Sequence, residues 1–278
     1  MNKKLISTIA VIMVSTLSLF AVSFKPFMET EQGTIGLLHH TYQNGEGGDE
    51  FDFIKQGGQN NLYPFSRYSV GATINENHRT WFTYQPLQID TAVNFASAVT
   101  IGGKTFDGPM EMTYSFPFYR GTYTYDILQN HEQAYLGVGL ALQIRNASIQ
   151  FREVYDGSVP DYYISQNVGI VPALAIYSEY RFPFGLTLSA DIAGSYANLA
   201  FINGADYKFE GSILDASLRM AYEIENGFSL FGNARFFGGT ADGISENDPG
   251  VWTESTEEYT KNYIATMTFS AGLSYQMQ

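Results

Sequence analysis

The clearest pattern in the chain is a two-residue alternation near its C-terminal end. From Tyr263 to Tyr275 every second residue is apolar or aromatic, and the residues between them, after Ile264, are small or hydroxylic. A period of two is that of a β-strand, whose side chains point alternately to opposite faces. Similar segments recur along the chain, with few helical stretches that could cover an apolar face. The pattern is typical of a transmembrane β-barrel strand, which has lipid outside and a polar lumen inside.

The alternation predicts about ten strands, each near or above the roughly 9–11 residues that a tilted strand needs to cross a bilayer. Their predicted ranges are 35–42, 67–75, 79–91, 108–127, 133–152, 167–181, 186–196, 211–225, 228–240 and 261–275. Tight turns at 76–78, 128–132, 182–185 and 226–227 alternate with long polar loops at 43–66, 92–107, 153–166, 197–210 and 241–260. Short periplasmic turns that alternate with long extracellular loops, on an even number of strands, characterise outer-membrane barrels. The predicted fold class is therefore all-β, a single antiparallel transmembrane barrel.

The strand phases predict which side chains face lipid. In the strand 211–225, Leu214, Leu218 and Met220 share the lipid-facing parity, and Asp215 and Arg219 share the other. In the strand 108–127 the apolar parity changes near Phe116-Pro117. Because proline cannot donate a hydrogen bond to the ladder, we predict a β-bulge there, and a similar irregularity at Pro86.

Projected inward, these phases predict a cluster of charges in the lumen. A charge on the lipid face would cost a few kcal/mol near the membrane midplane, which favours the inward assignment. The predicted cluster consists of Asp90, Glu111, Arg120, Arg145, Asp191, Asp215, Arg219 and Arg235. A barrel of about ten strands is narrow, so charges of both signs should pair and plug it. The alternative is a small polar passage or an internal ligand site.

The N-terminal segment has the features of a secretory signal peptide. Lys3 and Lys4 precede an apolar stretch from Leu5 to Val22, and Ala21-Val22-Ser23 is a plausible cleavage site. We therefore predict a signal peptide over 1–23 and a barrel over 24–278, with a retained membrane anchor as the alternative. The chain has no cysteine, which excludes a lipoprotein and a disulfide framework.

Charge and composition narrow the function further. Removal of residues 1–23 leaves 13 basic against 28 acidic residues, a net charge of −15, which argues against nucleic-acid binding. The chain has 20 Tyr and 21 Phe, with 15% aromatic and only 15% charged residues. Aromatic side chains are enriched where an apolar surface meets lipid headgroups, and a barrel carries two such girdles.

No catalytic, cofactor or metal site can be picked out from the sequence. The histidines are His39, His40, His78 and His131, and there is no His-x-x-x-His pair. His39 and His40 are neighbours on one predicted strand, so only one can point inward. A hydrolase would need one of them near an acid or a serine, because a base must be positioned against a nucleophile or water. The acidic loop from Asp242 to Glu258 is a poor match to a calcium-binding loop.

Several segments resemble an uncharacterised family of Gram-negative outer-membrane β-barrels. They are the runs 113–126, 139–149, 167–181 and 236–242, and the resemblance covers roughly residues 67 to 275. It implies an outer-membrane barrel surrounded by bilayer and lipopolysaccharide, inserted by the outer-membrane assembly machinery, and it implies no activity. Such barrels usually end in an aromatic residue, whereas this chain runs past Tyr275 to Gln276-Met277-Gln278.

Three functions are compatible with the sequence. The first is a structural or surface-interaction role for a barrel plugged by charges, with acidic extracellular loops. The second is porin-like passage of small solutes, which needs a continuous lumen. The third is an outer-membrane hydrolase on a ten-stranded barrel. The ligand, the partner of the loops and the oligomeric state are not specified by the sequence.

Overall fold

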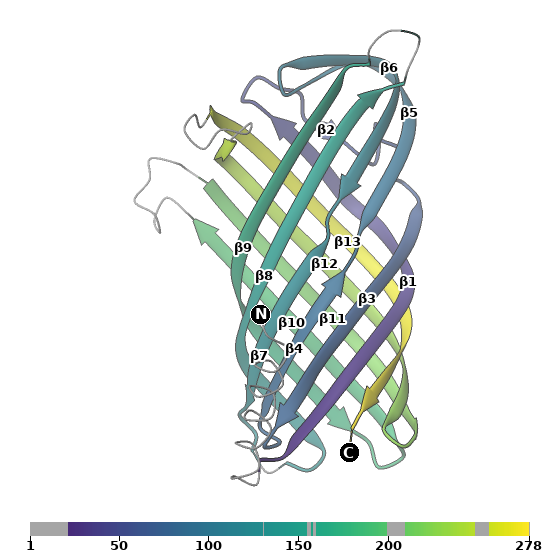
Figure 1. Ribbon diagram of the computed structural model, residues 1–278, viewed down its shortest axis with the longest axis vertical. Coiled ribbons are helices and arrows are strands. Elements are labelled where there is room, and N and C mark those ends of the chain that lie inside the picture. The colour runs from purple at the N-terminus through teal and green to yellow at the C-terminus, as the bar shows by residue number, and fades with distance from the viewer. Residues whose placement is uncertain are drawn as a thin grey trace, which may run out of the picture.

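The protein is a long β-barrel (Figure 1). The computed structural model describes residues 22–129, 131–154, 157, 160–198, 209–247 and 256–277, so most of the predicted signal peptide lies outside the described residues. None of the described residues belongs to a helix long and apolar enough to cross a membrane. The described strands are β1 (Phe24–Asn44), β2 (Phe51–Asp52), β3 (Leu62–Ile74), β4 (His78–Gln85), β5 (Gln88–Ile101), β6 (Lys104–Ser115), β7 (Phe118–Asp126), β8 (Ala134–Glu153), β9 (Tyr162–Arg181), β10 (Leu186–Asn198), β11 (Phe209–Glu225), β12 (Phe228–Asn247) and β13 (Thr256–Gln276).

Ten of these strands close the barrel with antiparallel neighbours throughout. The order around the wall is β1-β3-β4-β7-β8-β9-β10-β11-β12-β13, and pairing of β13 with β1 completes the circle. At one end lie the short connections at 75–77, 127–133, 182–185 and 226–227; we call it the short-turn end, and the opposite end the long-loop end. Phe27 pairs with Gln276 at the short-turn end. The predicted ten-stranded antiparallel barrel is thereby confirmed.

Pro86 lies between β4 and β5, and Pro117 lies between β6 and β7. These two prolines interrupt the pairing of the β4–β5 arm with the β6–β7 arm without changing its register. Gln85 pairs with Phe118 below the interruption, Gln88 pairs with Ser115 above it, and the Phe116 amide donates to the Leu87 carbonyl between them. No residue is inserted, so the predicted β-bulges at Pro117 and Pro86 are wrong. Register shifts occur instead between Leu37 and His39, between Phe95 and Val99, and between Glu223 and Glu225.

The apparent phase change near Phe116-Pro117 reflects a change in residue type along each face, and not a change in which face points inward. Every even-numbered residue from Met110 to Asp126 is buried inside the barrel, so the inward parity never changes. Along this face the residues change from Met, Tyr and Phe at 110–118 to Arg, Thr and Asp at 120–126. The outward face changes in the opposite sense, from polar residues at Glu111 and Thr113 to tyrosines at Tyr119 and Tyr123. The wall is therefore apolar outside in its lower part and apolar inside in its upper part.

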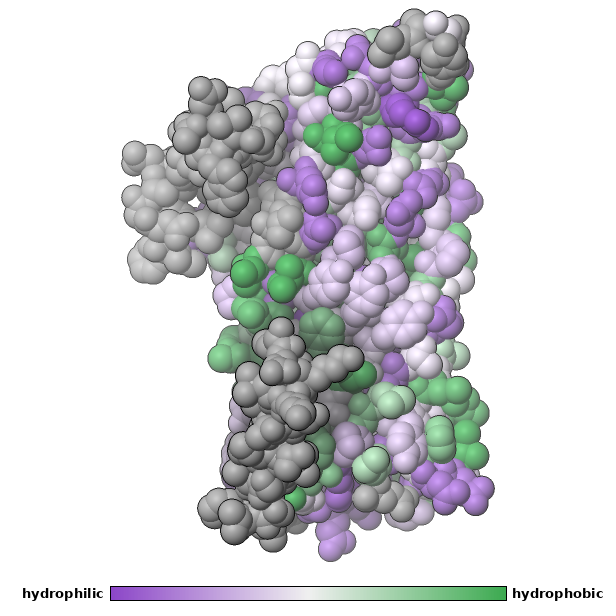
Figure 2. Space-filling model, in the orientation of Figure 1, coloured by the Kyte–Doolittle hydropathy of each residue, from purple (hydrophilic) through white to green (hydrophobic). Residues whose placement is uncertain are grey.

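The neighbouring strand β8 shows the same exchange at the same height. Its outward side chains are Leu140, Leu142 and Ile144 near the short-turn end, followed by Asn146, Ser148, Gln150 and Arg152 toward the long-loop end. Figure 2 shows strongly hydrophilic residues gathered over the upper part of one face and at its lower edge, with apolar and weakly polar residues between them. Lipid around the lower part of the wall explains its apolar outward face, and water around the upper part explains its polar outward face.

The strands extend further toward the long-loop end than the sequence predicts. The predicted loop at 92–107 is a hairpin of β5 and β6 that turns at Gly102-Gly103, where both φ angles are positive. Its polar outward face resembles a loop in sequence because the hairpin stands above the apolar band. β5 pairs only with β6 among the described strands, and β3 pairs with β4 only from Tyr68 onward. The wall therefore separates into two edges above Tyr68.

An apolar core fills the upper lumen behind this separation. Segment 45–61, which contains β2, folds inward from the end of β1, and Phe51 and Phe53 are fully buried. They pack against inward residues of β5, β6 and β8, such as Phe151 at 5.1 Å from Phe51 between ring centroids. We call this cluster the upper aromatic core. Burial of several aromatic rings in one cluster contributes a large part of the stability of such a unit.

Candidate functional site

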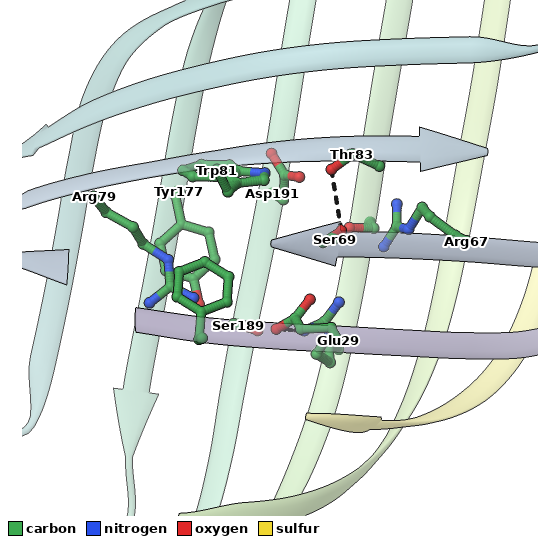
Figure 3. Close-up of a pocket in the computed structure, with 12 residues that line it drawn as sticks. Glu29, Arg67, Ser69, Arg79, Trp81, Thr83, Tyr177, Ser189 and Asp191 are labelled. Carbon is green, nitrogen blue, oxygen red and sulfur yellow. Dashed lines mark hydrogen bonds and ion pairs between the residues drawn. The ribbon is translucent and has the colours of Figure 1, made fainter. Parts of the chain in front are cut away.

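The lower lumen contains a cavity between the upper aromatic core and the short-turn end (Figure 3). It offers about 30 Å³ to the centres of water-sized molecules, and it is lined by inward residues of six strands. The lining residues are Phe27, Glu29, Arg67, Ser69, Arg79, Trp81, Thr83, Tyr177, Ser189, Asp191, Ser217 and Arg219. The two-residue period of the strands brings these side chains together, because each strand directs every second residue inward.

An ion-pair network lies beside this cavity at mid-height of the barrel. Asp215 accepts hydrogen bonds from Arg120 Nη1 at 2.9 Å and from Arg235 Nε and Nη2 at 2.6 and 2.9 Å. Arg120 also pairs with Asp191, and Arg235 Nη1 donates to Gln85 Oε1 at 2.7 Å. The side chains of Arg120, Arg235 and Asp215 are 1%, 1% and 3% exposed. We call these five residues the mid-lumen network; it satisfies buried charges that would otherwise carry a large desolvation cost.

Two further ion pairs extend the charged layer toward the short-turn end. Glu31 pairs with Arg67 and accepts hydrogen bonds from Asn233 Nδ2 at 3.2 Å and Ser270 Oγ at 3.1 Å. Glu29 accepts a hydrogen bond from Arg219 Nη1 at 2.7 Å, and the Arg219 guanidinium lies 4.0 Å from the centroid of the Phe231 ring. Together with the mid-lumen network, these pairs fill the narrow interior with mutually compensating charges.

The structure brings together most of the charges that the sequence projects inward, and separates others. Arg120, Asp191, Asp215 and Arg235 share the mid-lumen network, and Arg219 lies in the adjoining pair with Glu29. The side chain of Arg145 lies outside the described residues.

Asp90 and Glu111 do not join this group. Asp90 is exposed and accepts hydrogen bonds from Gln88 and Thr113, and Glu111 pairs with Arg152 on the outer surface. Their inward assignment assumed lipid outside, whereas at this height the outward face is polar and the inward face is apolar.

Sequence reasoning missed Glu29, Glu31 and Arg79 as members of the lumen. The predicted first strand begins at Ile35, whereas β1 begins at Phe24. In this part of β1 the inward Phe27 and the outward Gln32 obscure the alternation. The signal that could have identified the two glutamates is their shared parity with Ile35, and for Arg79 it is its shared parity with Trp81 and Thr83 in β4.

Neither adjacent histidine forms a catalytic arrangement in the described residues. The register shift after Leu37 turns His40 inward, where it is fully buried, stacks on Phe53 and lies 2.7 Å from Gln59 Oε1 through Nδ1. His39 lies next to the Tyr263 ring, with a long 3.4 Å contact from Nε2 to Thr41 Oγ1. No hydrogen bond joins either ring to a carboxylate or a serine among the described side chains. In the same residues, no group of acids and histidines could hold a metal ion.

Comparison with known proteins supports the fold and leaves the role open. No family model matches the chain, and no curated protein matches it. The chain is similar to the outer membrane protease OmpT from Escherichia coli, with a TM-score of 0.59 and 11% identity over 92% of this chain and 98% of that one. It is also similar to the outer membrane protein OprG from Pseudomonas aeruginosa, with a TM-score of 0.38 and 9% identity over 92% and 97%. The resemblance to an uncharacterised family stays a prediction.

Proposed function

We propose that this protein is an outer-membrane β-barrel that does not conduct solutes and acts through its surface at the long-loop end. Outer-membrane location is supported by the barrel fold and by the outward band of apolar and aromatic residues in the lower part of the wall. In this orientation the short-turn end faces the periplasm. The bilayer and lipopolysaccharide would surround the apolar band.

The observation that carries the proposal is the double closure of the lumen. The mid-lumen network blocks it with ion-paired side chains, and the upper aromatic core fills it above with fully buried rings such as Phe51, Phe53 and Phe106. A water-filled passage needs a polar lining along its whole length, and the upper aromatic core offers none. The porin-like alternative therefore requires that segment 45–61 leave the lumen.

The surface that remains for function is the polar outside of the upper barrel. The β5–β6 hairpin presents Asp90, Asp107 and Glu111 outward, and segment 45–61 begins with Glu46, Asp49 and Glu50. An excess of acidic groups favours a cationic partner and disfavours nucleic acid. The hydrolase alternative gains no support from His39 or His40, because neither has the acid or serine partner that it would need.

Conductance in a planar bilayer tests the closed lumen. The refolded mature barrel is expected to give no stable current steps, whereas a general porin reconstituted in parallel gives them. Stable, ion-selective steps from the folded, heat-modifiable protein would refute the closed lumen and make solute passage the leading function.

Epitope insertion tests the orientation separately. A tag at Gly102-Gly103, the turn of the β5–β6 hairpin, is expected to bind antibody on intact cells. The matched tag at Asn226-Gly227, a turn at the short-turn end, is expected to bind only after permeabilisation. The reverse result would place the short turns outside the cell.

We also infer that residues 1–23 are removed during export and that the outer-membrane assembly machinery inserts residues 24–278. The basic start, the short apolar stretch and the small residues at Ala21-Val22-Ser23 support cleavage. N-terminal sequencing of the protein from outer membranes is expected to begin at Phe24. An intact Met1 in the membrane fraction would instead support a retained anchor.

A further inference from the structure

Arg79 differs from the other arginines of the described lumen because no carboxylate pairs with it. Arg67, Arg120, Arg181, Arg219 and Arg235 each form an ion pair with an acidic side chain. The side chain of Arg79 has no ion pair or hydrogen bond to any described residue. It lines the lower cavity, close to the short-turn end. A charged side chain inside a protein normally has a partner of opposite charge or hydrogen-bonding groups around it. Arg79 is half-buried in the lumen and has no paired carboxylate.

The Arg79 guanidinium lies over two aromatic rings. Its central carbon lies 4.3 Å from the centroid of the Phe27 ring and 4.6 Å from that of the Tyr177 ring. Figure 3 shows Arg79 beside Tyr177 at one side of the cavity. A guanidinium donates hydrogen bonds only in its own plane. The rings contact the group, and no described side chain accepts a hydrogen bond from its N–H donors.

The cavity next to Arg79 has the charge and polarity for a small anion. Its charged lining consists of three arginines and two carboxylates, and both carboxylates are paired, Glu29 with Arg219 and Asp191 with Arg120. Hydroxyl groups come from Ser189 and Ser217 in the same lining, whereas Ser69 and Thr83 are hydrogen-bonded to each other at 3.1 Å.

We propose that the lower cavity binds a small carboxylate anion, held in the plane of the Arg79 guanidinium. The planar fork of arginine matches a carboxylate with two parallel hydrogen bonds. The mid-lumen network closes the upper side of the cavity, so the ligand enters from the short-turn end, which is the periplasmic end in the orientation proposed above. The site does not depend on the surface role of the long-loop end.

Trp81 provides a direct reading of the site. It lines the cavity and lies 5.7 Å from Tyr177 between ring centroids. The chain has only two tryptophans, so Trp252→Phe leaves Trp81 as the single reporter. The refolded full barrel in detergent is titrated with sodium acetate, while sodium gluconate, a bulkier anion, keeps the ionic strength constant. The expected result is a saturable change in Trp81 fluorescence.

Substitutions then assign the binding to Arg79. Arg79→Gln in the same background is expected to weaken acetate binding at least tenfold. Arg79→Lys keeps the charge without the planar fork and is expected to give an intermediate affinity. Arg152→Gln is the matched control, because Arg152 is paired with Glu111 on the outer surface and does not line the cavity; its affinity should equal that of the parent.

Two results would overturn the proposal. One is the absence of any saturable acetate response in the parent protein, which would mean that water alone completes the surroundings of Arg79. The other is an equal response in Arg79→Gln and the parent, which would place the anion elsewhere. If Arg79→Gln does not fold, Arg79→Lys and the acetate dependence of the parent's thermal unfolding decide the question, since a ligand specific to the folded state raises the midpoint.

Discussion

Replacing Asp215 with asparagine tests whether the mid-lumen network is buried as tightly as its geometry indicates. Asp215 accepts three hydrogen bonds from two arginines, and its side chain is only 3% exposed. Asparagine keeps the shape but removes the charge and places an N–H₂ group against guanidinium donors. Loss of one partner from a buried ion pair costs about 3–5 kcal/mol. Arg120 keeps Asp191 and Arg235 keeps Gln85, so we expect the lower part of that range, about 3 kcal/mol.

The assay is reversible urea unfolding of the barrel in lipid vesicles, followed by tryptophan fluorescence. The control is Glu111→Gln, which breaks the pair with Arg152 on the outer surface, where the two side chains are about half exposed at 46% and 54%. An exposed pair contributes at most about 1 kcal/mol, so this variant should unfold nearly as the parent does. Equal losses of unfolding free energy in the two variants would refute the reasoning, since the lumen would then be as well hydrated as the outside.

Three further changes test other parts of the barrel. Phe53→Ala is expected to reduce the unfolding free energy by about 3–5 kcal/mol in the same assay, because Phe53 is fully buried in the upper aromatic core; Phe53→Leu should cost clearly less. Gly33→Ala should reduce the heat-modifiable folded fraction on gels, because a Cβ there would lie 2.1 Å from the Phe269 carbonyl oxygen where β1 meets β13, whereas Gly121→Ala meets no atom within 4 Å and should fold normally. Partial burial raises the pKa of Asp52, but hydrogen bonds from the Lys55 and Ile54 amides and the Lys55 charge outweigh it and hold that pKa below its ordinary 3.8. A carboxyl group whose pKa is lowered in the folded state stabilises that state at pH values above its ordinary pKa, and this stabilisation is lost as the pH falls through the lowered pKa. Pepsin should therefore cleave segment 45–61 faster below about pH 4, and Asp52→Asn should remove this pH dependence.

The membrane-spanning part of the fold could be predicted because apolar and polar residues alternate along its strands with the same two-residue period as the side-chain directions. Lipid outside and ion pairs inside require different residues on successive positions, as at Leu214 to Met220 in β11. The short turns were also recognisable, since Asn226-Gly227 has positive φ angles at both residues. The strand alternation and the short turns depend on residues close together in the sequence and on a single surrounding medium, the lipid.

The upper barrel could not be predicted in the same way because water, and not lipid, surrounds it. Asp90 and Glu111 obey the two-residue period, but they lie where water is outside, so the lipid rule gave them the wrong side. Segment 45–61 has no regular period that indicates where it folds. Its burial depends on the separation of β3 from β5 and on rings such as Phe106 and Phe151, which come from distant parts of the chain.

The height at which the surroundings of the wall change from lipid to water can be measured on a single face of β8. The absence of cysteine from the chain makes any introduced thiol unique. Leu140 and Leu142 point outward in the lower part of the strand, and Ser148 and Gln150 point outward a few residues further on. Cysteines at these four positions share one strand and one face, so they differ only in height. In liposomes, a water-soluble maleimide should label positions 148 and 150 at least ten times faster than 140 and 142, while all four label alike in urea. Equal rates in liposomes would mean that the polar outward residues lie within the bilayer, and the exchange of faces would then need another cause.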